Sequence, residues 1–461
     1  MKRPLIACRH ATLVVLALLL VDCKDQPGLP VEPAVNTRTN VGPAMAAEVV
    51  RHLAAARGIV PLPRPPFVRP ALVQLGQALT FDKVLSGNRD ISCGTCHLPA
   101  FATGDGKSLS VGQGALGLGP ERTHAEGVFI PRNAPPLFNL GAMKHLFWDG
   151  RVQLAADGTV LTPAGNKISP TMARVFEFGP ISALGMFPVT NRAEMRANSG
   201  NELAEIADEK LPQIWSALMR RLGAIPEYRN MFEAAYPGER FDDMTFAHAS
   251  NAIAGFFVAR LTFADTPWDR FLAGQDEALT ESQLDGAQTF LTLKCSVCHS
   301  GSTFSDEQFH NVAVAQIGPG QGNGDSGHDD FGRMNVTGDA NDRYRFRSTP
   351  LRNVELTGPY GHDGAIVTLR GFVEHYSESD KKLLAFDPSP LEPALRGTLL
   401  PNALAILAQR DTLLNGVVLS ETLVDKLMAY MSALTDPAAR DRARITPDRV
   451  PSGLPVDRVR R

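Results

Sequence analysis

The stretch that decides the fold is Cys93-Gly94-Thr95-Cys96-His97, because its pattern returns as Cys295-Ser296-Val297-Cys298-His299. Both stretches read Cys-x-x-Cys-His. Two thiols one helical turn apart can form thioethers to the two vinyl groups of a haem, and the following His is then the proximal ligand of the iron. The sequence therefore predicts two covalently attached haems, held by Cys93, Cys96 and His97 and by Cys295, Cys298 and His299.

Two other interpretations of a Cys-x-x-Cys pattern explain less of the sequence. A thioredoxin-type redox motif does not need a His after the second Cys. A structural zinc site usually has its two Cys pairs within about 15 to 20 residues of each other. Here the pairs lie in different halves of the chain and each is followed by His, so haem attachment is the better interpretation.

Length and charge set broad limits on the protein. The chain has 461 residues, which is enough for two to three domains at about 100 to 200 residues each. Its formal net charge is -3, and acidic and basic residues are mixed along the chain. Nothing in this balance indicates a nucleic-acid partner.

The cysteines and the N-terminus indicate an exported protein. Of six cysteines, four belong to the two motifs and the others are Cys8 and Cys23, so the mature body should hold no disulfide. Basic residues precede a short apolar run at 11–21, which is typical of a signal peptide and too short to span a bilayer. We therefore predict an export signal at residues 1–23.

Leu20-Val21-Asp22-Cys23 resembles the lipobox of bacterial lipoproteins, although Asp22 stands where a small residue is expected. Two outcomes stay open. Lipidation of Cys23 would tether the protein to a membrane, and cleavage nearby would release it. Both place it in the periplasm, which agrees with haem attachment to Cys-x-x-Cys-His outside the bacterial cytoplasm.

Helical periodicity dominates the N-terminal half of the chain. Residues 24–66 are rich in Pro, Ala and Val and predict a tether, with one short helix at Ala46–Ala56. A helix from Ala71 leads into the first motif, and further helices are predicted at Glu202–Leu222 and Phe246–Leu261. Residues 152–180 read as an insertion with a small hairpin.

The second half begins with a predicted domain junction at Pro267–Asp276. Thr280-Glu281-Ser282-Gln283 is a capping box that opens the helix leading to the second motif. Another helix should start at Ser420. Residues 441–461 are rich in Arg and Pro without apolar period and predict a mobile tail.

No run of alternating strands is found along the chain. The fold class we predict is mainly α, with two cytochrome-c-like haem domains, long loops and few short strands. The domains should span residues 67–270 and 271–440.

Several stretches around the motifs make the chain similar to a known family. It resembles the bacterial diheme cytochrome c peroxidases and their relatives, the methylamine-utilisation (MauG-type) diheme enzymes, from about residue 71 to 436. The stretches that carry the resemblance are Pro131-Arg132-Asn133-Ala134-Pro135, Phe147-Trp148-Asp149-Gly150-Arg151, Ala193-Glu194-Met195, Phe309-His310-Asn311, Pro350-Leu351-Arg352-Asn353-Val354 and Leu356-Thr357-Gly358-Pro359-Tyr360-Gly361-His362-Asp363-Gly364.

The resemblance implies a division of labour, in which the N-terminal haem is the peroxidatic site and the C-terminal haem accepts electrons. In the peroxidases a distal His precedes the Arg-Asn-Ala-Pro segment, but here Gln113 stands at that place. An amide is a poor iron ligand, which favours a first haem that is open at rest. His124, in a local insertion, is the alternative ligand nearby.

At the second haem the resemblance implies a distal ligand from Tyr376, where the peroxidases have Met and the MauG-type enzymes have Tyr. A phenolate would stabilise ferric iron and lower the potential of this haem. The alternatives are that Tyr376 packs over the haem without ligation and that His375, Met334 or water binds instead.

The remaining site residues also come from the resemblance. Trp148 matches a Trp that lies between the two haems, and Glu194 matches a distal acid that would move protons during O–O cleavage. One calcium ion is expected at Asn133, Thr357 and Pro359. His310 and His362 recur in the matching stretches without an assigned role beyond hydrogen bonding near the cofactors.

These expectations combine into a diheme c-type peroxidase that reduces hydrogen peroxide with electrons from a small periplasmic donor, a cytochrome c or a cupredoxin. The alternative is a MauG-type oxidase of a protein side chain or another organic substrate, which uses high-valent iron; Gln113 and Tyr376 favour it. A plain electron-transfer cytochrome would need two closed haems, which Gln113 and Glu194 argue against. Members of the peroxidase kind are often dimers, and the sequence leaves the oligomeric state open.

Overall fold

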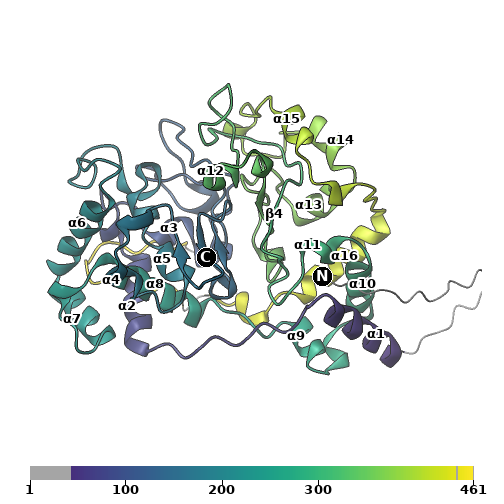
Figure 1. Cartoon of the computed structure of the whole chain (residues 1–461), viewed down its shortest axis with the longest axis horizontal. Helices are drawn as coiled ribbons and strands as arrows, with labels where there is room; N and C mark the ends of the chain where they lie inside the picture. Colours follow the sequence, from purple (N-terminus) through teal and green to yellow (C-terminus); the bar gives the residue numbers. More distant parts are fainter. Residues whose placement is uncertain (1–42, 443–444, 460–461) are drawn as a thin grey trace, which may run out of the picture. The chain divides into compact units, whose positions relative to one another are not determined.

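A computed structural model describes residues 43–442 and 445–459. The predicted export signal and Cys23 lie outside the described residues. Helices dominate the described part and strands are short, which confirms the predicted mainly α class (Figure 1). The helices are α1 (Pro43–Ala56), α2 (Pro70–Phe81), α3 (Cys93–Cys96), α4 (Pro170–Ala173), α5 (Pro180–Leu184), α6 (Leu211–Gly223), α7 (Pro226–Ala235), α8 (Phe246–Arg260), α9 (Pro267–Leu272), α10 (Glu281–Thr292), α11 (Cys295–Cys298), α12 (Met334–Thr337), α13 (Leu369–His375), α14 (Ser379–Leu384), α15 (Ala403–Ala408) and α16 (Glu421–Ala433).

The strands form two small antiparallel sheets. One has the order β1-β2-β3, and β4 pairs with β5 in the other. The turn between β2 and β3 contains Gly158 at φ +84°, a conformation that glycine adopts without strain. The hairpin predicted within residues 152–180 is therefore present. The strand bounds are β1 (His145–Leu146), β2 (Val152–Leu154), β3 (Val160–Leu161), β4 (Phe309–His310) and β5 (Phe346–Arg347).

One hydrophobic core lies around the first motif and is built mainly from α2, α6, α7 and α8. Gly76 lets α2 approach α8 closely, because a Cβ there would lie 1.9 Å from the carbonyl oxygen of Ala252. α6 begins at Leu211, nine residues later than the sequence predicted at Glu202. Pro212 explains the start, since proline is accommodated in the first turn of a helix and disfavours helix before it.

A second core surrounds the second motif and combines α1, α9, α10 and α16. The capping box predicted before α10 is present, with Thr280 as N-cap and Gln283 as its partner. Trp268 and Phe271 of α9 are fully buried in this core. The segment Pro267–Asp276, predicted as a domain junction, thus begins with a packed helix, and residues 273–276 are exposed.

The N-terminal end of the described chain packs on the second core, and the C-terminal end packs on the first core. α1, expected within a tether, buries Ala47, Val50 and Ala54 in the second core. Residues 445–459, which we call the strap, were expected to be mobile and instead pack on the first core. Figure 1 shows the yellow C-terminal segment returning to the region of α2 and α6.

The strap has no regular secondary structure and is held by scattered contacts. Val450 is buried in the first core, and Ile445, Leu454 and Val456 pack against it. Ser452 Oγ donates to Asp82 Oδ1 over 2.6 Å. These apolar residues lack helical spacing because an extended segment buries side chains wherever its path meets the core.

The strap reaches the first motif through one carboxylate. Asp457 Oδ2 accepts from Thr95 Oγ1 over 2.5 Å, and Asp457 Oδ1 lies 2.6 Å from Lys83 Nζ. Thr95 stands between the two motif cysteines. At the equivalent place in the second motif, Val297 is 39% exposed, so the described chain covers the two motifs unequally.

Candidate functional site

The first Cys-x-x-Cys-His motif forms one helical turn, α3. Its start is fixed by the Ser92 amide, which donates to Thr95 Oγ1 over 2.9 Å. Gly94 fits because a Cβ there would lie 2.4 Å from Cδ1 of Phe81. Cys93 and Cys96 are half-buried and form no disulfide, so both thiols are free for thioether bonds.

His97 follows this turn, and a backbone contact orients its ring. Nδ1 lies 2.8 Å from the carbonyl oxygen of Thr103. A carbonyl only accepts hydrogen bonds, so Nδ1 carries the proton and Nε2 keeps a free lone pair. Burial lowers the pKa of His97, which keeps the imidazole in the neutral form that binds metals.

The second motif repeats this arrangement on α11. His299 Nδ1 lies 3.0 Å from the carbonyl oxygen of Phe304, which again leaves Nε2 free. Burial lowers the pKa of His299 as well. Cys295 and Cys298 form no disulfide. Each motif therefore presents two thiols and one oriented, neutral imidazole, which is the donor set of a c-type haem.

A cavity of about 420 Å³ opens beside the second motif. Its volume lies within the usual range for ligand sites, and its lining is mainly apolar. These properties fit a haem attached to this motif. The predicted site residues among its lining are Asn133, Trp148, Cys295, Cys298, His299, Thr357, Pro359 and Tyr376.

Tyr376 follows α13 and faces the same cavity as His299. Its ring packs edge-on against Phe372, with ring centroids 5.5 Å apart. Burial and the nearby sulfur atoms of Cys298 and Cys295 raise the pKa of Tyr376. The phenol therefore keeps its proton unless a cation binds its oxygen.

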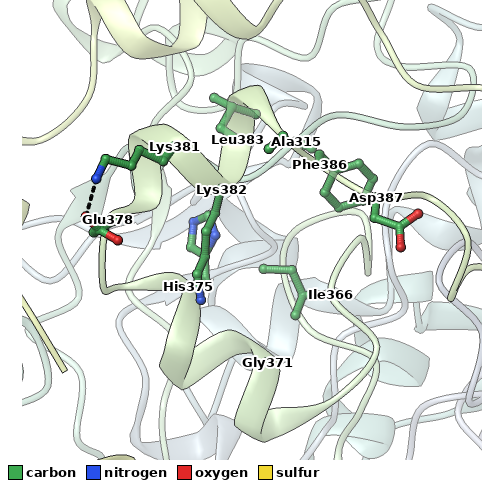
Figure 2. A pocket seen from close by; sticks show the side chains of 11 residues that line it. Ala315, Ile366, Gly371, His375, Glu378, Lys381, Lys382, Leu383, Phe386 and Asp387 are labelled. Carbon is green, nitrogen blue, oxygen red and sulfur yellow. Dashed lines mark hydrogen bonds and ion pairs between the residues drawn. The ribbon is translucent and has the colours of Figure 1, made fainter. Parts of the chain in front are cut away.

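The two alternatives to Tyr376 lie elsewhere. His375 Nε2 donates to the carbonyl oxygen of Val312 over 2.8 Å, and the residue lines a separate pocket of about 370 Å³ together with Lys382 and Phe386 (Figure 2). Met334, at the start of α12, does not line the cavity. The placement thus favours Tyr376 over both.

Glu194 lies in a single π-helical turn, Arg192–Arg196. Asn191 Oδ1 fixes the turn by accepting from the amides of Ala193 and Glu194 over 2.9 and 3.1 Å. Burial raises the pKa of Glu194, against the opposing effect of Arg151 and Arg132.

Glu194 also lies near the first motif. The pKa values of the Cys93 and Cys96 thiols are raised mainly by burial of these thiols. The negative charge of Glu194 is a smaller cause that also raises both pKa values. Such an effect in a buried site needs proximity. A protonatable carboxyl is therefore held beside the first motif.

Gln113 is anchored through its side chain and its backbone. Its Nε2 donates to Asp90 Oδ1, and its Oε1 accepts from Asn88 Nδ2 over 3.1 Å. Its backbone amide donates to the Ala193 carbonyl oxygen over 3.2 Å. The backbone contact places Gln113 beside the turn that carries Glu194. His124 is close by, since a Cβ on Gly114 would lie 3.2 Å from its Nε2.

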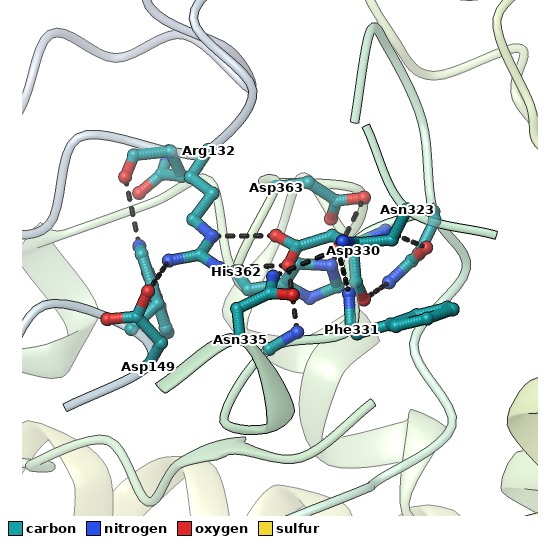
Figure 3. Close-up of polar contacts among 12 residues, drawn as sticks. Arg132, Asp149, Asn323, Asp330, Phe331, Asn335, His362 and Asp363 are labelled. Carbon is teal, nitrogen blue, oxygen red and sulfur yellow. Dashed lines mark hydrogen bonds and ion pairs between the residues drawn. The ribbon is translucent and has the colours of Figure 1, made fainter. Parts of the chain in front are cut away.

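Trp148 is buried and fixed at both its ring and its backbone. Its Nε1 donates to the Asn133 carbonyl oxygen over 3.0 Å, and its own carbonyl oxygen accepts from the Arg347 amide over 2.8 Å. The neighbouring Asp149 pairs with Arg132 at 2.6 Å. Arg132 also pairs with Asp330 at 2.6 Å, so one buried guanidinium ties the Trp148 segment to the second half (Figure 3).

The three residues expected to bind calcium, Asn133, Thr357 and Pro359, all line the same cavity. Asn133 Nδ2 donates to the carbonyl oxygens of Lys107 and Ser108 over 2.9 and 3.2 Å. This leaves Asn133 Oδ1 as a free oxygen donor. Thr357 and Pro359 also line this cavity, and backbone carbonyls are among the hard oxygen donors that suit calcium.

Sequence reasoning gave no role to His310, which the structure places against the second motif. It lies between Asp306 and Asp411, at 3.0 and 2.7 Å. These carboxylates, with Cys298, overcome the effect of burial and raise the pKa of His310 to about 11. Cys298, Asp306 and His310 also lie close enough to share a metal ion among the described residues, but a thioether at Cys298 would remove that donor. His362 stacks on Phe346 with centroids 3.7 Å apart.

Comparison with known proteins gives the family. The family model described as di-haem cytochrome c peroxidase matches residues 70–277. Cytochrome c551 peroxidase of Pseudomonas aeruginosa is 31% identical over 304 residues, which cover 65% of this chain and 70% of that protein. The chain belongs to the di-haem cytochrome c peroxidase family. It is thus an oxidoreductase, and membership implies haem c as the cofactor.

Other similar proteins include a MauG protein, a MauG-like protein and a diheme peroxidase. Methylamine utilization protein MauG of Methylorubrum extorquens is 29% identical over 372 residues, covering 79% of this chain and 87% of that protein. A MauG-like protein associated with microbial copper homeostasis shares the fold at a TM-score of 0.56 and 24% identity, covering 84% of this chain and 97% of its own. The diheme peroxidase BthA of Burkholderia thailandensis also has a TM-score of 0.56, at 19% identity and coverage of 85% and 91%.

In the part of the chain that the structure describes, no helix is both long and apolar enough to cross a membrane.

Proposed function

We propose that this protein is a diheme c-type peroxidase that reduces hydrogen peroxide to water. The electrons would come from a small periplasmic donor, a cytochrome c or a cupredoxin. The observation that carries the proposal is the half-buried, protonatable carboxyl of Glu194 beside the first motif, because peroxide cleavage needs a group that takes and returns a proton.

Residues 67–270 and 271–440 would each form a cytochrome-c-like domain with one haem, which supplies the redox-active iron. In the first domain, Cys93 and Cys96 would hold the cofactor and His97 would offer Nε2 to its iron. In the second, Cys295, Cys298 and His299 would do the same, and Tyr376, which lines the same cavity, would offer its phenolic oxygen.

At the first site, Glu194 would act as general base and then as general acid. It takes a proton from one oxygen of peroxide and gives it to the oxygen that leaves as water. Its raised pKa brings it nearer to neutral pH, where both proton transfers are favourable. Gln113 would leave the distal side open, because its amide is already hydrogen-bonded to Asp90 and Asn88.

Trp148 would carry electrons between the two sites. It is buried, lines the cavity of the second motif and is hydrogen-bonded on its ring nitrogen. A fixed indole between two redox centres shortens the distance of each electron transfer.

We also propose a calcium ion at Asn133, Thr357 and Pro359. Because Asn133 accepts the hydrogen bond from the Trp148 ring, this ion would link the Trp148 site to the second half of the chain.

The second candidate is a MauG-type oxidase of a protein side chain or another organic substrate. The placement of Tyr376 in the cavity favours it, since the sequence resemblance connects a Tyr at this position with the MauG-type enzymes. Both candidates use the same residues to hold the two haems. They differ in the source of the electrons, which is a small donor protein for the peroxidase and the oxidised substrate itself for the oxidase.

For location, we propose the periplasm, with Cys23 as a membrane tether if it is lipidated. Export would follow from the signal predicted at residues 1–23.

Two measurements test the proposal. Steady-state oxidation of a reduced small cytochrome by hydrogen peroxide should be fast, whereas a MauG-type oxidase would show slow peroxidase turnover and would bind and oxidise a quinoprotein precursor. Low-temperature EPR of the oxidised protein should show one high-spin and one low-spin ferric signal, and Tyr376→Phe should change only the low-spin signal. Two low-spin signals indifferent to the substitution would contradict an open first haem and a Tyr-bound second haem.

A further inference from the structure

Buried arginines in the described part of the chain fall into two groups. Those that form ion pairs with carboxylates are Arg132, Arg196, Arg221 and Arg352. Those buried without an ion pair are Arg122 and Arg347. A buried guanidinium without a negative partner is unfavourable, so the second group calls for an explanation.

Arg122 is explained by its hydrogen bonds. Its three guanidinium nitrogens donate to the carbonyl oxygens of Val111, Gly117 and Gly112 over 2.7 to 3.0 Å. All sides of the fork are thereby occupied by acceptors. Arg347 has no comparable set of partners.

Within the described ranges, Arg347 makes only two hydrogen bonds, and both are long. Its Nε donates to the Phe147 carbonyl oxygen over 3.3 Å and its Nη1 to the Ser348 carbonyl oxygen over 3.2 Å. Its Nη2 has no partner among the described residues. The side chain lines the cavity beside the second motif, so this unfilled side of the fork adjoins the space that fits a haem.

The charged groups around Arg347 do not neutralise it. Burial lowers its pKa to about 10 and Glu307 opposes this effect, so the guanidinium is still charged at neutral pH. The Glu307 carboxylate accepts from the amides of Lys144 and His145 and forms no ion pair with Arg347. On the strand paired with β5, the cationic His310 lies between Asp306 and Asp411, and Arg345 lies 3.7 Å from Asp411. Two cations thus balance two carboxylates, and this cluster adds no net negative charge.

We propose that Arg347 binds a propionate carboxylate of the haem attached to the second motif. A haem brings two carboxylates, and the planar fork of arginine matches a carboxylate with two parallel hydrogen bonds. The inference rests on the proposed second haem site. Arg347 would then balance the negative charge of this propionate. Its backbone amide also donates to the Trp148 carbonyl oxygen over 2.8 Å, so this balancing charge lies on the strand that contacts Trp148.

The experiment compares Arg347→Gln with the wild-type holoprotein by spectroelectrochemical titration of each haem at several pH values. In the wild type the fixed cation keeps the propionate ionised, and the pair is neutral. In Arg347→Gln a bare carboxylate remains at high pH, which stabilises ferric iron and lowers the second-haem potential. At low pH this propionate becomes protonated and the potential returns towards the wild-type value.

The expected result is therefore a new pH dependence confined to the second haem, while the first haem titrates as before. His145, whose Nδ1 lies 3.7 Å from Glu307 Oε2, is present in both proteins and cancels in the comparison. Arg347→Lys keeps the charge and should show a nearly wild-type potential without the new pH dependence. It also serves if Arg347→Gln does not fold.

Arg333→Gln is the matched control. Arg333 Nη1 also donates to backbone carbonyls, those of Asp149 and Gly150, over 3.0 and 3.1 Å, but Arg333 does not line the cavity. Its replacement should leave the pH dependence of the second haem unchanged. An Arg347→Gln protein whose second-haem potential is unshifted, or shifted equally at all pH values, overturns the inference. Haem content measured on the same samples separates this outcome from loss of the second haem site itself.

Discussion

Glu194→Gln tests the proposed peroxide chemistry most directly, because it keeps the shape of the side chain and removes its ability to take a proton. The backbone of this turn is fixed by Asn191, so the substitution should not move the loop. General acid–base catalysis contributes about 10² to 10⁴ in rate, which corresponds to about 3 to 5 kcal/mol of barrier.

The structure places the expected loss near the lower end of this range. A second buried carboxyl, Asp105, acts on the pKa of the Cys96 thiol and therefore also lies near the first motif. Burial raises the pKa of Asp105 to about 6, and its Oδ2 has no hydrogen-bond partner. Because Asp105 is available as a weaker substitute, Glu194→Gln should lower kcat/KM for peroxide about 100-fold, and Asp105→Asn added to it should lower it further.

The assay is the rate of oxidation of a reduced small cytochrome as a function of peroxide concentration and pH. The base must be ionised to act, so activity should fall as pH drops through the pKa of Glu194, which burial raises above its ordinary value. Arg151 lowers that pKa, so Arg151→Gln should move the acid limb to higher pH. Full activity in Glu194→Gln, or an acid limb that stays in place in both variants, would refute the assignment.

Three further outcomes are expected. Tyr376→Met should raise the reduction potential of the second haem, because a thioether favours ferrous iron more than a phenolate does, and a potential that does not change would mean that Tyr376 is no ligand. Removal of calcium with a chelator should reduce activity and calcium should restore it, whereas magnesium should not, and Asn133→Ala should abolish this response. Asp457→Ala loses the charge-assisted hydrogen bond from Thr95 and the half-buried ion pair with Lys83, so urea unfolding followed at the first haem should show a loss of about 2 to 3 kcal/mol. The exposed pair of Arg449 and Glu227 provides the control Arg449→Gln, which should leave the stability nearly unchanged because water and salt screen an exposed ion pair.

The sequence was most informative where structure depends on neighbouring residues. The two Cys-x-x-Cys-His turns, the capping box at Thr280 and the hairpin around Gly158 all depend on contacts within a few residues. Such contacts leave a fixed spacing in the sequence, and that spacing can be recognised without knowledge of the rest of the chain.

The features that the sequence did not predict depend on residues far apart. The strap has apolar residues without a period, because an extended segment follows the surface it covers. Nothing in the sequence around Arg347 indicates that it lines a cavity or that it lacks an acidic partner, because both depend on residues far from it in the chain. Of the two carboxylates that hold His310 as a cation, Asp306 is four residues away, but Asp411 lies 101 residues away.

The covering of one motif by the strap has a consequence for how the holoprotein is assembled. Asp457 lies 362 residues after Thr95, so a chain that emerges N-terminus first presents Cys93 and Cys96 long before the strap exists. Haem should therefore be attached to the first motif before the strap packs over it. The second motif has no such limit in the described structure, since Val297 stays exposed, and loading should proceed in the order of the chain.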